Sequence, residues 1–145
     1  MNKKIIVSGI NFAEGGPLSV FKDCLEKLSK RSHEYDITAL VHNKELFNIK
    51  NINYVEFPKS KKTWLHRLFY EYIYFYFYSK KIKPYLWLSM HDITPNITSE
   101  IKAVYCHNPS PFYKMTSLEI KLAPKLFLFN KFYKYLYGIN IKKND

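Results

Sequence analysis

The chain has 145 residues, enough for one well-buried domain and too few for two. Its hydrophobic content of 47% argues against disorder, and its aromatic content of 18% is high. The formal net charge of +11 favours an anionic partner, which includes a lipid surface, a phosphorylated substrate or a nucleic acid. A coding bias toward Lys, Asn, Ile, Tyr and Phe explains the same composition, so the charge indicates a type of partner and not a function.

Cysteine usage and the lengths of the apolar runs predict the compartment. Only two cysteines occur, Cys24 and Cys106, so there is no disulfide framework and a reducing compartment fits. The apolar run at residues 5–7 is too short for a signal peptide, and no stretch reaches the ~18 uncharged apolar residues of a membrane-spanning helix. We therefore expect a cytoplasmic protein.

Strand-like and helix-length segments alternate along the chain. A first buried strand is predicted at residues 4–9, where β-branched apolar residues end in a glycine. The other strand-like segments are residues 37–42, 52–57, 85–90 and 102–106. The helix-length segments are residues 17–30, 64–81 and 118–137. Pro124 either starts a new helix or kinks the last one.

This alternation predicts an α/β fold, a Rossmann-like parallel sheet of about five strands with helices on both faces. We expect residues 1–145 to form one domain of this kind. Right-handed crossovers bring the carboxyl ends of all the strands to one edge of the sheet. Ligands bind beyond that edge, where the strand order reverses, so the functional residues are expected there.

The loop at residues 11–17 leaves the first strand and contains Gly15 and Gly16. Paired glycines let backbone N–H groups approach a ligand, and the helix N-terminus that follows adds partial positive charge, so a phosphate is the expected ligand. The spacing differs from the dinucleotide motif G-x-G-x-x-G, which disfavours an NAD site. A simple tight turn is the alternative interpretation of the same pair.

The loop at residues 89–97 follows the fourth strand and contains His91, Asp92 and Asn96. Polar groups at this place can form hydrogen bonds with sugar hydroxyls, and Asp92 can accept a proton. An Asx turn, in which Asp92 or Asn96 bonds to its own backbone, explains these residues equally well.

His107 directly follows the fifth strand and is expected to face the same crevice as the loop after the fourth strand. A lone histidine is more often structural than catalytic, but histidines at two neighbouring strand ends favour a site. No metal site is predicted, because Cys106 and His107 would point to opposite faces of a strand and no ligand-pair spacing is present.

The segment at residues 64–81 combines an aromatic run with basic ends. Its central residues are expected to pack between the sheet and a neighbouring domain, with tyrosine hydroxyls reaching water. Its basic ends leave open a peripheral contact with the inner face of the membrane. No nucleic-acid recognition motif accompanies the charge, so a nucleic-acid partner is not predicted.

Three pieces of the sequence resemble the N-terminal, acceptor-side half of a family 4 glycosyltransferase of the GT-B fold. They are residues 5–9 followed by 15–20, residues 87–92, and residues 104–112. The last piece resembles the C-H-N-P-S-P-F segment of bacterial enzymes that build surface polysaccharides. The resemblance covers nearly the whole chain.

The resemblance implies a role for each matching residue. Gly15 and Gly16 would lie over the diphosphate of the donor, and His107, as the catalytic residue, would lie near the reacting sugar. The residues that would bind the acceptor are His91, Asp92 and Asn96. The reaction implied is transfer of a sugar, with retention of configuration, from a nucleotide sugar to a glycan or a lipid-linked acceptor, without a metal or another cofactor.

Members of this family also carry a second Rossmann-like domain with an E-x7-E motif, which holds the nucleotide, and this sequence lacks it. We therefore expect an incomplete first domain that is inactive alone, because transfer needs donor and acceptor in one cleft. A fragment, a truncated reading frame and one part of a split enzyme all fit. The alternative function is a non-catalytic basic and aromatic module that docks on an anionic membrane or a partner protein.

Overall fold

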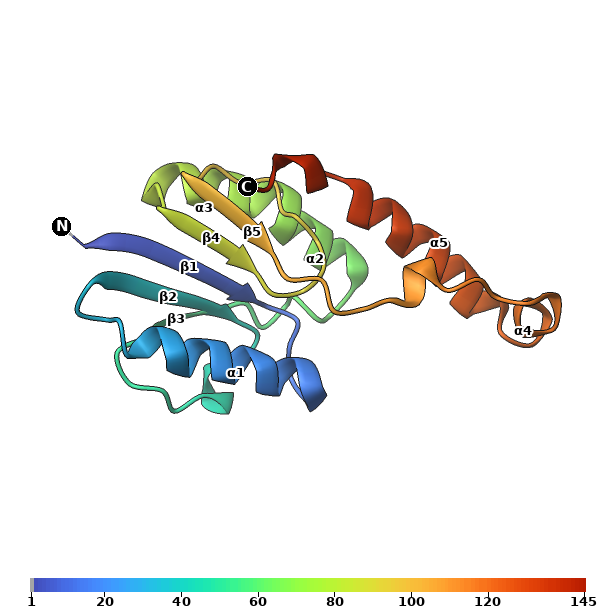
Figure 1. The fold of residues 1–145 in the computed structure, drawn as a ribbon, viewed down its shortest axis with the longest axis horizontal. Coiled ribbons are helices and arrows are strands. Elements are labelled where there is room, and N and C mark those ends of the chain that lie inside the picture. The colour runs from blue at the N-terminus through green and yellow to red at the C-terminus, as the bar shows by residue number, and fades with distance from the viewer. Residues whose placement is uncertain (1) are drawn as a thin grey trace.

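The computed structural model describes residues 2–145 and contains one five-stranded sheet in which all strands are parallel (Figure 1). The strand order is β3-β2-β1-β4-β5. The strands are β1 (Lys3–Gly9), β2 (Tyr35–Val41), β3 (Asn53–Glu56), β4 (Leu86–Ser89) and β5 (Ile101–Val104). The order reverses between β1 and β4, which makes their carboxyl ends the expected ligand-binding place. The predicted α/β class with a parallel, Rossmann-like sheet is confirmed.

Helices lie on both faces of the sheet, with α1 on one side and α2 and α3 on the other (Figure 1). The helices are α1 (Gly15–Ser29), α2 (Trp64–Phe69), α3 (Phe75–Ile82), α4 (Ser117–Leu122) and α5 (Pro124–Gly138). A π-helical turn, η2 (Tyr70–Tyr74), joins α2 to α3. The short 3-10 turns are η1 (Lys44–Leu46), η3 (Ser110–Phe112) and η4 (Ile141–Lys143). The aromatic segment is therefore helical, as predicted.

Alternation along β1 divides the core into two layers. Ile5 and Val7 pack with Phe21 of α1, whereas Ile6 packs with Phe75 of α3 on the opposite face of the sheet. Val7, Ile6, Phe21 and Phe75 are completely buried. Each such side chain contributes about 1.5–3 kcal/mol by leaving water, so the two layers hold α1 and α3 against the sheet.

The carboxyl-terminal half of α5 packs against α2 and η2 through a third buried cluster, which includes Ile93, Tyr133 and Tyr137. Figure 1 shows the other half of α5 extending with α4 beyond the end of the sheet. Thr116 starts α4 by a reciprocal capping box, in which its hydroxyl accepts from the backbone N of Glu119 and its backbone N donates to the Glu119 carboxylate. Pro124 begins α5, where its missing N–H is harmless.

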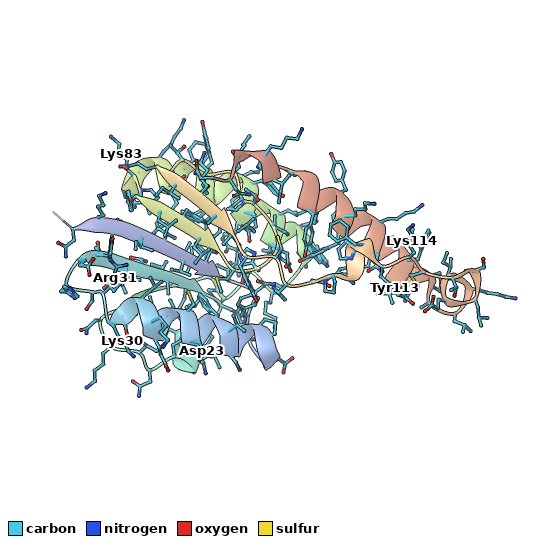
Figure 2. The ribbon with its side chains drawn as sticks, in the orientation of Figure 1. Asp23, Lys30, Arg31, Lys83, Tyr113 and Lys114 are labelled. Atoms are coloured by element: carbon cyan, nitrogen blue, oxygen red, sulfur yellow. The ribbon has the colours of Figure 1, made fainter. Side chains whose placement is uncertain are left out.

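Much of the excess positive charge lies at the periphery of the fold. Figure 2 shows Lys30, Lys83 and Lys114 extending outward from three separate parts of the chain. All three residues are exposed. Charges dispersed in this way raise the potential around the whole molecule and do not by themselves define a site.

Gly9 ends β1 where the ring of Phe21 approaches the backbone, and a Cβ added at Gly9 would lie 2.6 Å from Phe21 Cε1. We expect Gly9→Ala to lower the free energy of unfolding by about 1–3 kcal/mol, because the completely buried ring has to shift. Urea denaturation measures this. Gly138→Ala is the matched control, since its Cβ would meet nothing within 4 Å. Equal stability of the two variants would contradict the packing described for β1 and α1.

Candidate functional site

Two adjacent cavities lie at the carboxyl edge of the sheet. The edge pocket has a volume of about 380 Å³ and is lined by polar groups that include Asn11, Glu14, Lys61, Asp92, His107 and Asn108. The glycine pocket has a volume of about 180 Å³ and is lined by residues that include Gly16, Val20, Met90, Tyr105 and His107. His107 lines both pockets, so it stands where the two cavities meet.

The glycine loop forms the start of α1. Gly15 has a φ of +73°, a left-handed conformation that favours glycine. Gly16 has no heavy atom within 4 Å of the place where a Cβ would be. The N-cap residue Glu14 makes no side-chain hydrogen bond to the helix, so no side chain caps the first-turn N–H groups. Pro17 in this turn has no N–H, so the backbone N–H groups of Gly15 and Gly16, together with the helix dipole, are the ones that can receive an anion.

Asp92 connects the ends of β4 and β5. Its Oδ1 accepts hydrogen bonds from the backbone N of His107 at 2.6 Å and of Asn108 at 3.2 Å. Asp92 is buried and has a φ of +66°. A non-glycine residue in this conformation costs about 1–3 kcal/mol, so the surrounding contacts must hold it there. The carboxylate therefore positions the backbone that carries His107.

The imidazole of His107 lies between aromatic rings. Its ring stacks on Tyr105, with centroids 6.0 Å apart, and meets the ring of Phe12 edge-on at 5.9 Å. Nδ1 lies 3.3 Å from Asp92 Oδ1 but has no hydrogen-bond partner among residues 2–145. The side chain is 26% exposed. His107 is thus held in orientation while it remains accessible to a ligand.

His91 is completely buried and lines neither pocket. Its Nε2 lies 3.2 Å from Ser8 Oγ and 3.2 Å from Glu71 Oε1. Arg67 Nη2 donates to the His91 carbonyl at 3.1 Å and lies 3.4 Å from Nδ1. Because a guanidinium only donates, Nδ1 is assigned as the acceptor and Nε2 as the protonated nitrogen. Burial, followed by the charge of Arg67, keeps the pKa of His91 well below its ordinary value, so the ring is neutral.

Asn96 also lies outside both pockets. Its backbone N donates to the Glu71 carbonyl at 2.9 Å, and its side-chain Nδ2 donates to the Tyr72 carbonyl at 3.3 Å. It satisfies carbonyls of η2, where the wider π-helical turn leaves backbone acceptors available. His91 and Asn96 therefore both contact other parts of the fold and line neither pocket, and their contacts with an acceptor stay a prediction. Of the three predicted acceptor residues, Asp92 lines the edge pocket.

The structure adds residues that the sequence did not single out for the site. Asn11, Asn108 and Tyr133 line the edge pocket, and the hydroxyl of Tyr137 donates to the Asn108 carbonyl at 2.8 Å. Asn11 and Asn108 lie in loops that the sequence already predicted to border the site, so their positions in the sequence could have identified them. Tyr133 comes from α5, and a tyrosine within a tyrosine-rich helix gives no signal of this kind.

Residues 2–145 contain no group of three or more His, Cys, Asp or Glu side chains that could hold a metal ion. No helix within residues 2–145 is long and apolar enough to cross a bilayer.

Glu71 is completely buried, and this burial raises its pKa to about 8, with the charge of Arg67 acting in the opposite direction. The unfolded chain has an ordinary carboxyl pKa of ~4.3, so between this value and about 8 the folded protein binds more protons and its stability falls as the pH rises. His91 acts oppositely, because its lowered pKa reduces stability as the pH falls through ~6.5.

In the unsubstituted protein, we expect the free energy of unfolding to fall by on the order of 1 kcal/mol between about pH 7 and about pH 8.5. Glu71→Gln should remove this fall, because it removes the titrating carboxyl group. Urea denaturation at both pH values measures this fall. Glu26→Gln, at an exposed position of α1, is the control and should retain it. The same pH dependence in Glu71→Gln and the unsubstituted protein would show that Glu71 is not protonated in the folded state.

Comparison of the chain with family models, with curated proteins and with solved structures finds no match.

Proposed function

We propose that the chain is the acceptor-side Rossmann-like domain of a retaining family 4 glycosyltransferase of the GT-B fold. Such an enzyme transfers a sugar from a nucleotide sugar to an acceptor of the surface-polysaccharide type. One observation carries the proposal: His107, at the end of β5, lines the glycine pocket and the edge pocket together. A single imidazole thus lies between a mostly apolar cavity beside the uncapped N-terminus of α1 and a cavity whose polar groups suit sugar hydroxyls.

The glycine pocket is the donor side in this proposal. Gly16 offers backbone without a side chain, and the first turn of α1 is not capped by Glu14. Both features suit the diphosphate of a nucleotide sugar, since free N–H groups and the helix dipole favour negative charge.

The edge pocket is the acceptor side. Asp92, Asn11 and Asn108 supply acceptors and donors for sugar hydroxyls, and Asn11 Oδ1 is buried without a hydrogen-bond partner among residues 2–145. A buried polar atom of this kind gains most from a ligand that completes its hydrogen bonding. Phe12 and Tyr133 add apolar surface against which a sugar ring can pack.

His107 is the residue that would contact the reacting sugar, with its ring held by Tyr105 and its backbone by Asp92. A hydrogen bond from the imidazole would orient the sugar and stabilise charge that develops as the bond to the diphosphate breaks. A second, nucleotide-binding domain would complete the cleft, because transfer needs donor and acceptor held together.

In a transferase reconstituted from this chain and a nucleotide-binding domain, we expect His107→Ala to lower kcat about 100-fold. Release of the nucleoside diphosphate measures turnover, and circular dichroism checks the fold. His33→Ala, whose side chain is 73% exposed, is the control and should retain the rate.

We expect Gly16→Leu to raise the KM for the donor about tenfold or more, because the side chain would occupy the space needed by the diphosphate. The free energy of unfolding should change little, since no protein atom lies within 4 Å of the added Cβ. Near-normal kinetics in both Gly16→Leu and His107→Ala would show that the site is elsewhere.

A second candidate function is docking on an anionic membrane, and the outer face of the α2–α3 segment favours it. Phe69, Ile73 and Phe77 are exposed there and border a shallow groove of about 560 Å³ that also contains Lys81. These central residues were expected to be packed against a neighbouring domain. Exposed aromatic and aliphatic side chains beside lysines suit a lipid interface with negative charge.

Sedimentation with vesicles tests this second candidate. The chain should pellet with vesicles that contain anionic lipid, bind less as the salt concentration rises, and bind weakly to neutral vesicles. Phe77→Ser should reduce the pelleted fraction, because it removes apolar surface from the groove. Absence of pelleting at low salt would eliminate membrane docking as the function.

A further inference from the structure

A third cavity, with a volume of about 290 Å³, adjoins the edge pocket. We call it the basic pocket and define it by Lys61, Lys62, Thr63 and Arg67. Asn11 and Lys61 line both this cavity and the edge pocket, so a ligand can extend from one into the other. The basic pocket shares no lining residue with the glycine pocket, so it is a separate place from the proposed donor side.

Arg67 is the unusual residue of the basic pocket. The residue is only 7% exposed, and its Nε is buried without a hydrogen-bond partner among residues 2–145. No carboxylate within residues 2–145 forms an ion pair with its guanidinium. The guanidinium carbon lies 5.1 Å from the centroid of the Trp64 ring, and this cation–π contact compensates part of the charge of Arg67. A buried cation with an unused donor is costly unless an anion pairs with it.

The acid nearest in sequence does not supply that anion. Glu71 lies one helical turn beyond Arg67, but its own burial raises its pKa to about 8, which keeps much of it protonated at neutral pH. His91 is neutral and accepts from Nη2 of Arg67, so it does not compensate the charge of the guanidinium. The protein thus fixes the guanidinium in place and leaves its charge for a ligand.

The other groups of the pocket suit a ligand with more than one negative charge. Lys61 and Lys62 are exposed at its mouth, and no carboxylate within residues 2–145 lines the cavity. A guanidinium with a planar set of donors matches a phosphate or a carboxylate, and the added ammonium groups favour the more highly charged phosphate.

We infer that the basic pocket binds a phosphate or diphosphate group on the acceptor, whose sugar lies in the adjoining edge pocket. The identity of the ligand as an acceptor rests on the proposed function, whereas binding of the phosphate does not. The substrate class is then a sugar phosphate, either soluble or carried on a lipid.

Calorimetric titration of the 145-residue chain with inorganic pyrophosphate at low salt tests the phosphate site. The double variant Lys61→Ala/Lys62→Ala should weaken binding about tenfold, because charge-assisted contacts are lost from the pocket. Lys80→Ala/Lys81→Ala is the matched control, since it removes the same charge from exposed positions outside the pocket. Arg67→Lys, which keeps the charge but loses the planar set of guanidinium donors, should weaken binding at least as much while the chain stays folded.

Other outcomes of this titration overturn the inference. No binding by the unsubstituted chain, or an equal loss in both lysine pairs, would show that no specific phosphate site exists. If Gly16→Leu abolishes binding and Lys61→Ala/Lys62→Ala does not, the anion binds in the glycine pocket. That result would contradict the basic pocket while it leaves the proposed function intact.

Competition against pyrophosphate identifies the source of the phosphate. A soluble sugar phosphate and the same compound with an alkyl chain should both displace pyrophosphate, and the sugar without phosphate should not. Tighter binding of the alkylated compound would indicate a lipid-linked acceptor, and equal binding a soluble one. Equal competition by the sugar without phosphate would overturn the inference. Phosphate binding without any sugar dependence would retain the phosphate site and remove its link to a glycosyl acceptor.

Discussion

The carboxylate of Asp92 is the interaction on which the geometry of this sheet edge depends. It comes from the loop after β4 and accepts hydrogen bonds from two successive backbone N–H groups after β5, at His107 and Asn108. Parallel strands end without a turn that links them directly, so the relative position of their loops must come from contacts of this kind. Asp92 makes these contacts while its backbone is in the left-handed region, with a φ of +66°. This link fixes the backbone of His107, while Tyr105 and Phe12 hold its ring between the two pockets.

A second layer of polar contacts lies beneath this edge. His91, next to Asp92 in sequence, contacts Ser8 of β1 and Glu71 of η2, and Arg67 donates to its carbonyl. This cluster joins the end of the central strands to the helix that carries the basic pocket. Neutral forms of His91 and Glu71 make the cluster tolerable in a dry interior, because a buried unpaired charge is far more costly than a buried neutral group. The carboxyl edge of the sheet is therefore supported in part by His91 and Glu71, which line none of the three pockets.

The sequence predicted the parallel sheet because buried strands have a distinctive pattern, as in residues 4–9, and helix-length segments separate them. It placed His107 and Gly16 at the sheet edge for the same reason. It could not distinguish a histidine that faces a pocket from one that faces the core, because His91 is buried by Glu71 and Arg67 from a segment about twenty residues earlier. The residue pattern of a loop does not show which side chains from distant segments pack against it.

The net charge is a second property of the sequence that does not show where a ligand binds. A value of +11 indicates an anionic partner but says nothing of where it binds. In the structure, exposed lysines such as Lys30, Lys83 and Lys114 are dispersed (Figure 2), and each interacts with solvent that screens it. Arg67 differs because it is buried, held by His91 and left with an unused donor. Electrostatic attraction from the dispersed charges can raise the rate of encounter with an anion, but only a desolvated, oriented cation can select its geometry. In our proposal, the residue that selects the anion is this one buried arginine, which composition alone counts with all the other basic residues.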